Sequence, residues 1–398
     1  MLDLRSGEPV YIAGAVRTPI GRFGGGLASL SAPDLGTLAV QAAIERSSLP
    51  AEAVDHVILG HGRQAGAGPN PARQASVRAG IPVEVPAYTV NQACASGMKS
   101  IILGAQNLRL AMADAVVCGG MESMSNTPYL VPSARWGARL GHADLVDGMY
   151  RDGFLCPLSG DLMGRTAERL AEQYGIGRLR QDEFAVESQA RAGAAVQAGA
   201  FDAEIVAVEV PGRKGPQTVA ADEHLRPEAN VESMAKLKPV FKDNGTVHPG
   251  NSSGITDGAA ALVVVSESAV ERYGMVPQAR ILAATEAGVE PAVMGIGPVP
   301  AVQKLLEGLA MDISDIDLIE LNEAFAVQAL AVSDELGIDL ARTNVNGGAI
   351  ALGHPIGCTG TRIVVTLIHA LQQRSSRLGL ATLCVSGGMG MSLLLERV

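Results

Sequence analysis

Two segments of this 398-residue chain follow one plan, and this repetition constrains the fold more than any other feature. Residues 90–121 run through Cys94, a predicted helix and a predicted strand to Gly-Gly-Met. Residues 346–389 run through His354, a predicted helix and a strand ending at Cys384 to a second Gly-Gly-Met. Alternating strand-like and helical patterns are typical of layered α/β folds. The simplest interpretation is two similar α/β halves, and the alternative is chance similarity of two α/β units.

The same alternation extends along the chain. Predicted strands cover residues 10–15, 54–59, 115–118, 260–265, 318–321 and 381–385. Predicted helices cover residues 35–46, 98–112, 166–173, 182–198, 300–309, 324–336 and 361–373. The intervening region, rich in charge, proline and glycine, predicts a large inserted loop domain. We therefore expect residues 1–123 with 250–273 to form the N-terminal half, 124–249 the loop domain and 274–398 the C-terminal half.

Composition excludes several classes of protein. Hydrophobic residues make up 47% of the chain and charged residues 18%, which indicates a folded globular protein. The net charge is −10 and no basic stripe occurs, so nucleic acid is not an expected partner. The most apolar late stretch, residues 350–371, is interrupted by His354, Pro355, Arg362 and His369, so no membrane span is expected. Without a signal-peptide pattern at the N-terminus, the expected location is the cytoplasm.

The cysteines suggest neither a disulfide framework nor a metal site, because their number is odd and no Cys-x-x-Cys occurs. They are Cys94, Cys118, Cys156, Cys358 and Cys384. Cys94 directly precedes a predicted helix, where unpaired N–H groups and the helix dipole favour a thiolate and stabilise an oxyanion. A buried, inert cysteine is the alternative interpretation.

Three further residues are candidates on local grounds. His354 lies in a rigid Gly/Pro loop that presents its ring, and a histidine beside a cysteine activates the thiol. Cys384 ends an apolar strand that opens into glycines, where α/β proteins place ligands. Asn322 follows the strand at 318–321, where it can hold a water or cap the next helix. For each of them, a structural role is the alternative on this evidence.

Other polar motifs point away from a site. Residues 21–26 lack the spacing of a dinucleotide fingerprint, so NAD is not expected. His61, Gln64 and Arg73 lie in a polar Gly/Pro stretch and are predicted to be surface or subunit contacts.

Taken together and in this order, the motifs resemble those of the thiolases along nearly the whole chain. The matching stretches are residues 17–25, 64–66, 70–74, 91–97, 119–125, 250–254 and 322–325, the loop around His354 and the segment around Cys384. The resemblance implies a five-layered αβαβα core built from two similar halves, with a large inserted loop domain.

The resemblance also implies roles for the candidates. Cys94 takes the acyl group as a thioester, and His354 activates the Cys94 thiol. Asn322 positions a water that completes an oxyanion hole with that histidine. Cys384 moves the proton of the leaving or incoming group. Such covalent catalysis implies ping-pong kinetics with acyl-CoA and CoA as substrates, and neither a metal nor a cofactor.

Binding residues follow from the same resemblance. Ser253 would lie along the pantetheine arm of CoA, Arg226 near its adenine and phosphate end, and Phe241 along the channel. Met163 and Phe325 would flank the acyl group.

The chain departs from the family pattern at three places. Ser386 replaces a usual glycine, although its backbone N–H can still form a second oxyanion hole with that of Cys94. Leu162 stands where acetoacetyl-specific members often have histidine. His248-Pro249 replaces small residues before the pantetheine loop.

The expected reaction is reversible acyl transfer between acetoacetyl-CoA and acetyl-CoA. The alternatives are a longer-chain 3-ketoacyl-CoA thiolase of β-oxidation and a non-catalytic acyl-CoA or lipid binder. A decarboxylating ketoacyl synthase would need a second histidine in place of Cys384. The resemblance further implies a homodimer or homotetramer, with residues 128–147 as a contact loop.

Overall fold

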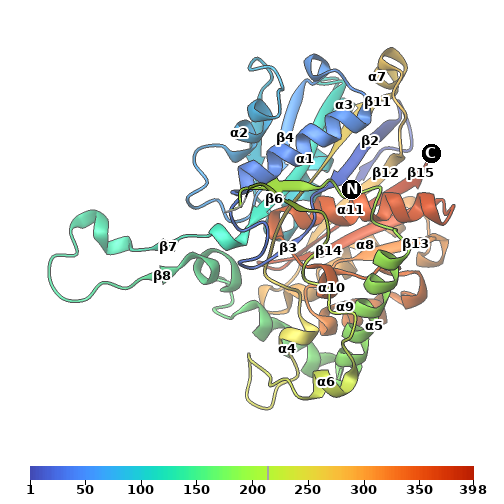
Figure 1. The fold of residues 1–398 in the computed structure, drawn as a ribbon. Coiled ribbons are helices and arrows are strands. Elements are labelled where there is room, and N and C mark those ends of the chain that lie inside the picture. Colours follow the sequence, from blue (N-terminus) through green and yellow to red (C-terminus); the bar gives the residue numbers. More distant parts are fainter. Residues whose placement is uncertain (213–214) are drawn as a thin grey trace.

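A computed structural model describes residues 1–212 and 215–398 of the chain, and its centre is an 11-stranded sheet (Figure 1). Nine strands form a continuous path: β13 (Leu318–Leu321), β14 (Leu378–Val385), β15 (Met389–Arg397), β12 (Ala279–Gly288), β2 (Val10–Arg17), β11 (Thr256–Ser266), β6 (Ala115–Ser123), β4 (His56–Gly60) and β5 (Ala87–Val90). Two short strands lie off this path, where β1 (Leu2–Asp3) pairs with β12 and β3 (Gly21–Arg22) pairs with β11.

The sheet consists of two halves with the same topology. In the first, β2, β11 and β6 pair antiparallel, and β6, β4 and β5 pair parallel. In the second, β12, β15 and β14 pair antiparallel and β14 pairs parallel with β13, which forms a parallel bridge to Thr343 in the place of a fifth strand. Within the sheet, the halves join where β12 pairs with β2 through Ala279–Ile12 and Arg280–Tyr11 and with the short strand β1. The duplicated plan predicted from the sequence is therefore confirmed.

Helices form the other three layers. The helices α1 (Ala32–Ser47) and α2 (Pro71–Arg78) lie against the outer face of the first half, whereas α8 (Pro298–Leu309) and α9 (Ala326–Leu336) lie against the second. Between the halves lie α3 (Ser96–Arg109) and α11 (Ile356–Gln373), which share one core with strands of both. Mutual burial of these apolar faces is the main force holding the layers together. The order is α, β, α, β, α, as expected.

Glycines allow the two central helices to approach closely at their N-terminal ends. A Cβ atom on Gly97 of α3 would lie 2.7 Å from the backbone nitrogen of Thr361 in α11. A Cβ atom on Gly360 would collide with the backbone of Met98. Larger residues would push the helices apart, so these glycines set the distance between the two halves.

The inserted residues 124–249 contain helices and short strands. The helices α4 (Met163–Tyr174) and α5 (Arg178–Gln197) pack against α9 of the second half, and α6 (Val231–Ala235) packs against α5. β9 (Val208–Val210) pairs with β10 (Gln217–Val219), and β7 (Tyr129–Leu130) pairs with β8 (Val146–Asp147). The β7–β8 hairpin projects from the body of the protein (Figure 1). It exposes Trp136 and Leu140, which are 83% and 98% accessible.

Every strand and helix predicted from the sequence overlaps an observed element of the same type. The sequence-based analysis missed β5, β12, β15 and α2. It also missed α6, α7 (Glu267–Tyr273), α10 (Ala349–Leu352) and the short strands β1, β3, β7, β8, β9 and β10. It also placed the first Gly-Gly-Met after a strand, which is wrong because Gly119 and Gly120 lie within β6. A side chain at Gly120 would collide with the carbonyl of Gly357 in α11, which explains glycine inside a buried strand. Among the described residues, no helix combines the length and apolarity required to cross a membrane.

Candidate active site

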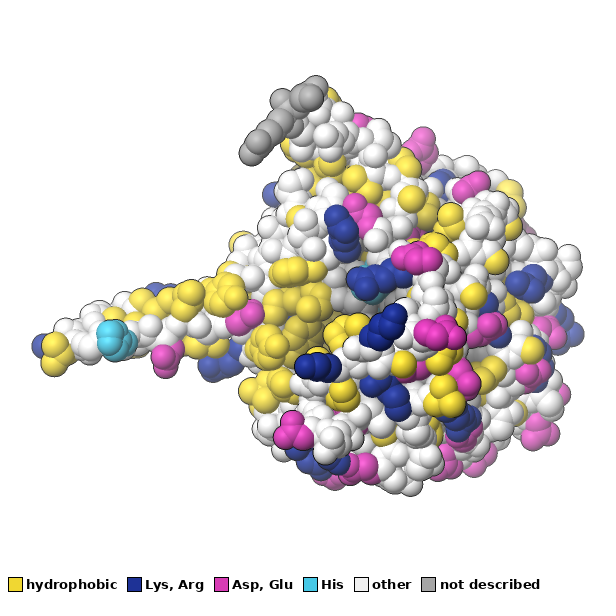
Figure 2. Space-filling model, turned by 60° about the horizontal axis from the view of Figure 1, so that its bottom comes forward, with side chains coloured by type: hydrophobic (Ala, Val, Ile, Leu, Met, Phe, Trp, Pro, Cys, Tyr) yellow, Lys and Arg dark blue, Asp and Glu magenta, His cyan; other side chains and the backbone are white. Residues whose placement is uncertain are grey.

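A cavity of about 1230 Å³ brings the two halves and the inserted segment together. Three of the four predicted catalytic residues line it, namely Cys94, His354 and Cys384. All six predicted binding residues line it as well: Met163, Arg226, Phe241, Ser253, Phe325 and Ser386. Figure 2 shows basic side chains around a hollow on one face of the molecule, next to a broad hydrophobic area.

Cys94 lies in a tight 3-10 turn (Ala93–Ala95) between β5 and α3. Ala93 adopts a left-handed conformation with φ of 46°, which is uncommon for a residue with a side chain. The side chain of Asn91 accepts a hydrogen bond from the Ala93 N–H at 2.9 Å and stabilises this turn. The turn places the thiol ahead of the helix, facing His354.

Burial raises the pKa of the Cys94 thiol above its ordinary value, although the backbone N–H of Ser386, Arg63 and the N–H of Cys94 itself act in the opposite direction. The expectation that the position before a helix makes this thiol acidic is therefore wrong in its net direction. Cys94 rests as a thiol and needs a base to become a nucleophile.

His354 supplies a base in the right place. Its Nε2 atom lies 3.3 Å from Sγ of Cys94, and its Nδ1 atom lies 2.6 Å from Oγ1 of Thr359. The Thr359 hydroxyl donates to the carbonyl of Pro355 at 3.0 Å, so it accepts from Nδ1–H. Nε2 consequently carries the lone pair that faces the thiol.

The charge of this histidine is also defined. Burial lowers its pKa to about 3, with further lowering from the positive charges of Arg362 and Arg63. His354 is therefore neutral near pH 7 and able to accept the Cys94 proton. Gly353, with φ of 112°, leads into the ring position, and a Cβ atom there would lie 2.9 Å from the side chain of Ile20.

Cys384 is the second thiol of the cavity. It is buried near the C-terminal end of β14, and burial together with the nearby Cys94 raises its pKa far above its usual range. It therefore remains protonated near pH 7. A buried, protonated thiol across from a nucleophile is placed to donate a proton.

Asn322 is buried at the end of β13 but does not line the cavity. Its backbone N–H donates to the carbonyl of Thr382 at 3.0 Å, two residues before Cys384. Within residues 1–212 and 215–398, neither the oxygen nor the nitrogen of its side-chain amide has a protein partner. An unpaired buried amide leaves room for a hydrogen-bonded water.

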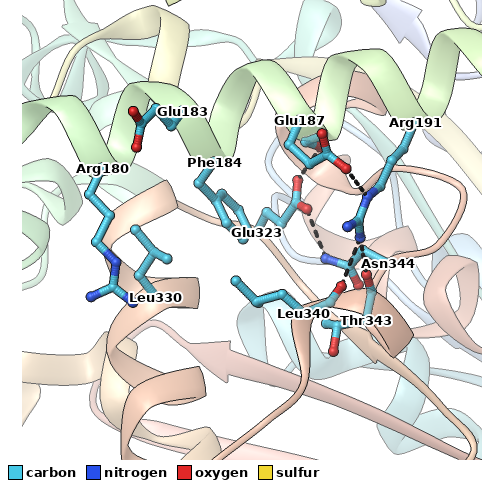
Figure 3. A pocket seen from close by; sticks show the side chains of 11 residues that line it. Arg180, Glu183, Phe184, Glu187, Arg191, Glu323, Leu330, Leu340, Thr343 and Asn344 are labelled. Atoms are coloured by element: carbon cyan, nitrogen blue, oxygen red, sulfur yellow. Dashed lines mark hydrogen bonds and ion pairs between the residues drawn. The ribbon is translucent and has the colours of Figure 1, made fainter.

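The neighbouring Glu323 has a structural role. It accepts hydrogen bonds from Ser188 at 2.7 Å, Asn344 at 2.8 Å and the backbone N–H of Ile350 at 3.1 Å. Glu323 thereby fixes the chain that leads to His354. It also lines a second, smaller pocket, where Arg191 bonds with Glu187 and with the carbonyls of Leu340 and Thr343 (Figure 3).

The predicted CoA-binding residues surround the wider part of the cavity. The rings of Phe241 and Phe325 meet edge to face at 6.4 Å. The backbone N–H of Ser253 donates to the carbonyl of Ala324 at 3.1 Å, which ties its loop to the start of α9. Leu162 also lines the cavity.

His248 is buried beneath the same loop. Its Nε2 atom lies 2.7 Å from Asp182 of α5, and its Nδ1 accepts from the N–H of Gly250 at 3.1 Å. Asn251 also donates to Asp182 at 3.0 Å. The departure at His248-Pro249 therefore anchors the predicted pantetheine loop, with Pro249 facing the cavity.

Sequence reasoning missed the buried carboxylate that supports this site. Glu122 accepts backbone hydrogen bonds from Gly62, Arg63 and Gly357 and lies 3.2 Å from Nε2 of His61. Burial is the largest single influence and raises the pKa of Glu122, but His61, Arg63 and the N–H of Gly357 together outweigh it, so the pKa is lowered. His61 is buried, so its predicted surface location is wrong. The available signal for Glu122 was its position in the motif that begins at Gly119.

The other two residues of that polar stretch are half-buried. Gln64 donates to the carbonyl of His61, and Arg73 donates to the carbonyls of Val83 and Val85. Among the described residues, no cluster of three histidine, cysteine, aspartate or glutamate side chains could hold a metal ion.

Comparison with known families decides the relationship of the chain. The family model described as "Thiolase, N-terminal domain" matches residues 10–268, and "Thiolase, C-terminal domain" matches residues 275–397. The chain belongs to the thiolase family. These limits fall close to the start of the C-terminal half predicted at residue 274.

Curated thiolases of bacteria are similar over almost the whole chain. The acetyl-CoA acetyltransferase of Escherichia coli is 52% identical over 388 residues, which are 97% of this chain and 98% of that protein. The acetyl-CoA acetyltransferase of Pseudomonas aeruginosa is 50% identical over 98% of this chain and 100% of its own.

Solved structures share the fold. The Bacillus anthracis acetyl-CoA acetyltransferase superposes with a TM-score of 0.96 at 43% identity, covering 99% of this chain and 100% of that chain. Human mitochondrial 3-ketoacyl-CoA thiolase in complex with CoA superposes with a TM-score of 0.95 at 41% identity, covering 100% of this chain and 99% of its own.

Proposed function

We propose that this thiolase is an acetyl-CoA acetyltransferase that interconverts acetoacetyl-CoA plus CoA with two molecules of acetyl-CoA. The observation that carries the proposal is the 3.3 Å contact between Sγ of Cys94 and Nε2 of a neutral His354, in a cavity that also holds Cys384. Two curated relatives of the same name at 50% and 52% identity support it.

The first half-reaction transfers an acetyl group to the protein. Cys94 gives its proton to Nε2 of His354, and Sγ attacks the C3 carbonyl of acetoacetyl-CoA. The bond between C2 and C3 breaks, leaving its electron pair on C2 as the enolate of acetyl-CoA. Cys384 donates its proton to C2, and acetyl-CoA leaves.

The second half-reaction returns the group to CoA. The Cys384 thiolate takes the proton of the incoming CoA thiol, and the CoA sulfur attacks the acetyl thioester on Cys94. The second acetyl-CoA departs, and His354 returns the proton to Cys94. In both half-reactions these three side chains make every bond between the protein and the acyl group and every proton transfer, and condensation is the reverse sequence. Neither step calls for a metal or redox cofactor.

Oxyanions arise in both half-reactions. The backbone N–H groups of Cys94 and Ser386 both act on the Cys94 sulfur, so they are suited to an oxygen of a thioester formed there. Protonated Nε2 of His354 and a water held by the unpaired amide of Asn322 form the second proposed oxyanion hole.

Coenzyme A would enter where the cavity carries Arg22, His224 and Arg226. The backbone N–H groups of Arg22 and Arg226 donate to Glu223 and Gln189, which fixes the two residues at the cavity, and their guanidinium groups carry the charge that suits phosphates. Ser253 and the Phe241–Phe325 pair would line the path of pantetheine and the start of the acyl chain, with Met163 beside them. The CoA complex of the human structural relative supports a CoA site.

A second candidate is thiolysis of longer 3-oxoacyl chains. Leu162 lines the cavity with an apolar side chain, and a human 3-ketoacyl-CoA thiolase shares the fold. The deciding measurement is the kcat/KM of thiolysis with CoA for unbranched 3-oxoacyl-CoA of increasing length. A maximum at acetoacetyl-CoA supports the first assignment, and a maximum at longer chains supports the second. Absence of thiolysis at every length would remove both and leave a non-catalytic binder.

We further propose that the protein works in the cytoplasm as a homo-oligomer, a dimer or a tetramer. The projecting β7–β8 hairpin exposes Trp136, Leu140 and Leu145, and exposed apolar surface of this kind marks contacts between proteins. Sedimentation should give a dimer or tetramer at micromolar concentration, whereas a monomer would contradict this.

A further inference from the structure

Two segments of the cavity wall are tied to one buried carboxylate that lies behind them. The segments are the predicted pantetheine loop at residues 249–254 and residues 233–237, where α6 ends. The carboxylate belongs to Asp182 of α5, which is 2% accessible and is not among the lining residues of the cavity. None of the reaction steps above uses it, and its place behind both segments suits it to positioning them.

The pantetheine loop is bonded to one oxygen of this carboxylate. Nε2 of His248 lies 2.7 Å from Oδ1 of Asp182, and the side-chain amide of Asn251 donates to the same oxygen at 3.0 Å. Because Nδ1 of His248 accepts from the N–H of Gly250, the ring proton is on Nε2 and is donated to Asp182. Asn251 also accepts from the backbone N–H of His248 at 2.9 Å. These bonds fix the loop from behind.

The end of α6 is bonded to the other oxygen through an arginine. Nε of Arg178 donates to Oδ2 of Asp182 at 2.7 Å, and its Nη2 donates to the carbonyls of Met234 at 2.6 Å and Leu237 at 3.0 Å. The two segments also touch each other, because a Cβ atom on Gly250 would lie 2.6 Å from the side chains of both Met234 and Leu237. A displacement of either segment would therefore displace the other.

The Asp182 carboxylate keeps its charge in this buried place. Burial raises its pKa, but the interactions with His248 and Arg178 together outweigh burial, so the pKa is lowered. Hydrogen bonds to an ionised group are stronger than those between neutral groups, and a buried charge that loses a partner is costly. Asp182 therefore holds both segments of the wall firmly from behind it.

We propose that Asp182, acting through His248 and Arg178, is a positioning residue that fits the cavity wall to the long arm of CoA and so lets the enzyme distinguish CoA from short thiols. The inference rests on the proposed thiolase function, in which Ser253 of the same loop lies along pantetheine. Binding energy from the non-reacting part of a substrate depends on a wall that is already in place. Loss of the Asp182 contacts should therefore weaken the binding of CoA.

The reacting groups are held by other contacts. Cys94 lies in its own turn before α3, and the ring of His354 is bonded to Thr359 of α11. The backbone N–H of His354 reaches the pantetheine loop at Gly254, at the opposite end from His248. A change at Asp182 should therefore act on the KM for CoA much more than on kcat.

The test compares CoA with N-acetylcysteamine, a thiol that keeps only the reactive end of pantetheine. Thiolysis of acetoacetyl-CoA by CoA and of S-acetoacetyl-N-acetylcysteamine by N-acetylcysteamine is measured for the wild type and for Asp182→Asn. We expect the variant to lose about 10–100-fold in kcat/KM with the CoA pair, mostly through KM, because contacts to a buried charge are lost. With the short pair, kcat/KM should change by a much smaller factor.

Further variants give the comparison its controls. Arg180→Gln removes an exposed ion pair with Asp334 from the same helix and should leave both substrate pairs unchanged. His248→Ala should raise the KM for CoA, and His248→Gln, which keeps an N–H within reach of Asp182, should recover part of that loss. If Asp182→Asn does not fold, Arg178→Gln removes the link to α6 and should give a smaller loss that is again confined to the CoA pair.

The outcomes separate this inference from the function on which it rests. Equal losses with the CoA pair and the short pair in Asp182→Asn would indicate a general structural role and refute the positioning role. An unchanged KM for CoA, or a loss confined to kcat, would also refute it. If the wild type cleaves neither acetoacetyl thioester, the proposed thiolase activity itself fails.

Discussion

Cys94 and Cys384 are the same side chain in two different settings within one cavity. Cys94 comes from the first half, in a strained turn with His354 at 3.3 Å and the N–H of Ser386 nearby. Cys384 comes from the second half, near the end of a buried strand, and burial is the largest influence that raises its pKa. The first thiol has a base and donors for an anion, and the second is kept protonated. Environment alone suits the first to the proposed role of nucleophile and the second to the proposed role of acid.

The strongest test of this difference removes the nucleophile. Cys94→Ala leaves no atom to carry the acyl group, so we expect turnover to fall by about 10⁵-fold or more. Incubation with radiolabelled acetyl-CoA, followed by digestion, should place the label on Cys94 in the wild type and nowhere in the variant. Label on Cys384 would exchange the two roles, and an active but unlabelled wild type would contradict a covalent mechanism.

Removing the acid should have a smaller effect of a different kind. Cys384→Ala should reduce complete turnover by about 10²–10⁴-fold, the usual contribution of a general acid or base. Cys94 should still become labelled by an activated acyl-CoA. Cys118→Ala, a buried thiol of β6 outside the cavity, is the matched control and should keep most of the activity. Loss of labelling in Cys384→Ala would show that this thiol is needed before the acyl-enzyme forms.

A third test of the difference between the two cysteines changes Thr359, the hydrogen-bond partner of His354. Thr359→Val removes the hydroxyl that accepts the Nδ1 proton of His354, so the tautomer and ring position are no longer fixed. We expect acylation of Cys94 to slow by about 10–100-fold, with the proton transfer by Cys384 unaffected. Single-turnover acylation and deacylation rates distinguish the two steps. Thr359→Ser should restore most of the rate, and an equal loss in both variants would indicate a packing effect instead.

The smallest expected effect concerns pH. The folded-state pKa of His354 is lowered from 6.5 to about 3, so below pH 6.5 the unfolded chain binds a proton that the folded protein does not. This contribution to stability is complete above pH 6.5 and is lost as the pH falls toward 3. It amounts to about 1.4 kcal/mol per pH unit. In urea unfolding, His354→Gln should lose less stability than the wild type between pH 6.5 and 5, and equal losses would contradict the neutral histidine.

The sequence predicted the fold and the candidate residues that line the cavity because local signals could be combined with the order of the motifs along the chain. A glycine-rich turn before a helix and a strand ending in glycines mark the positions of Cys94, His354 and Cys384, and the order of the motifs relates the two halves. The strands β12 and β15 were missed. They pair with each other inside the second half, and β12 also pairs with β2 of the first half. Their place is set by partners far away in the chain, which local patterns do not contain.

The environments of individual side chains also could not be predicted from the sequence. The motif suggested an acidic Cys94, but burial by residues from both halves outweighs the nearby N–H groups. His61 looked like a surface residue in a polar stretch, and only the folded structure brings Glu122 against it. The burial of Arg63 beside Cys94 and Glu122 was not predicted either, because these residues come together only in the folded structure.

The close contact of α3 and α11 also determines when this chain becomes chemically competent. Cys94 leaves the ribosome with the first half, and His354 follows 260 residues later. Until α11 packs against α3 at Gly97 and Gly360, the Cys94 thiol has no base and does not react with cellular thioesters. A truncated or partly folded chain therefore has no activated thiol, because Cys94 gains its base only when α3 and α11 pack together.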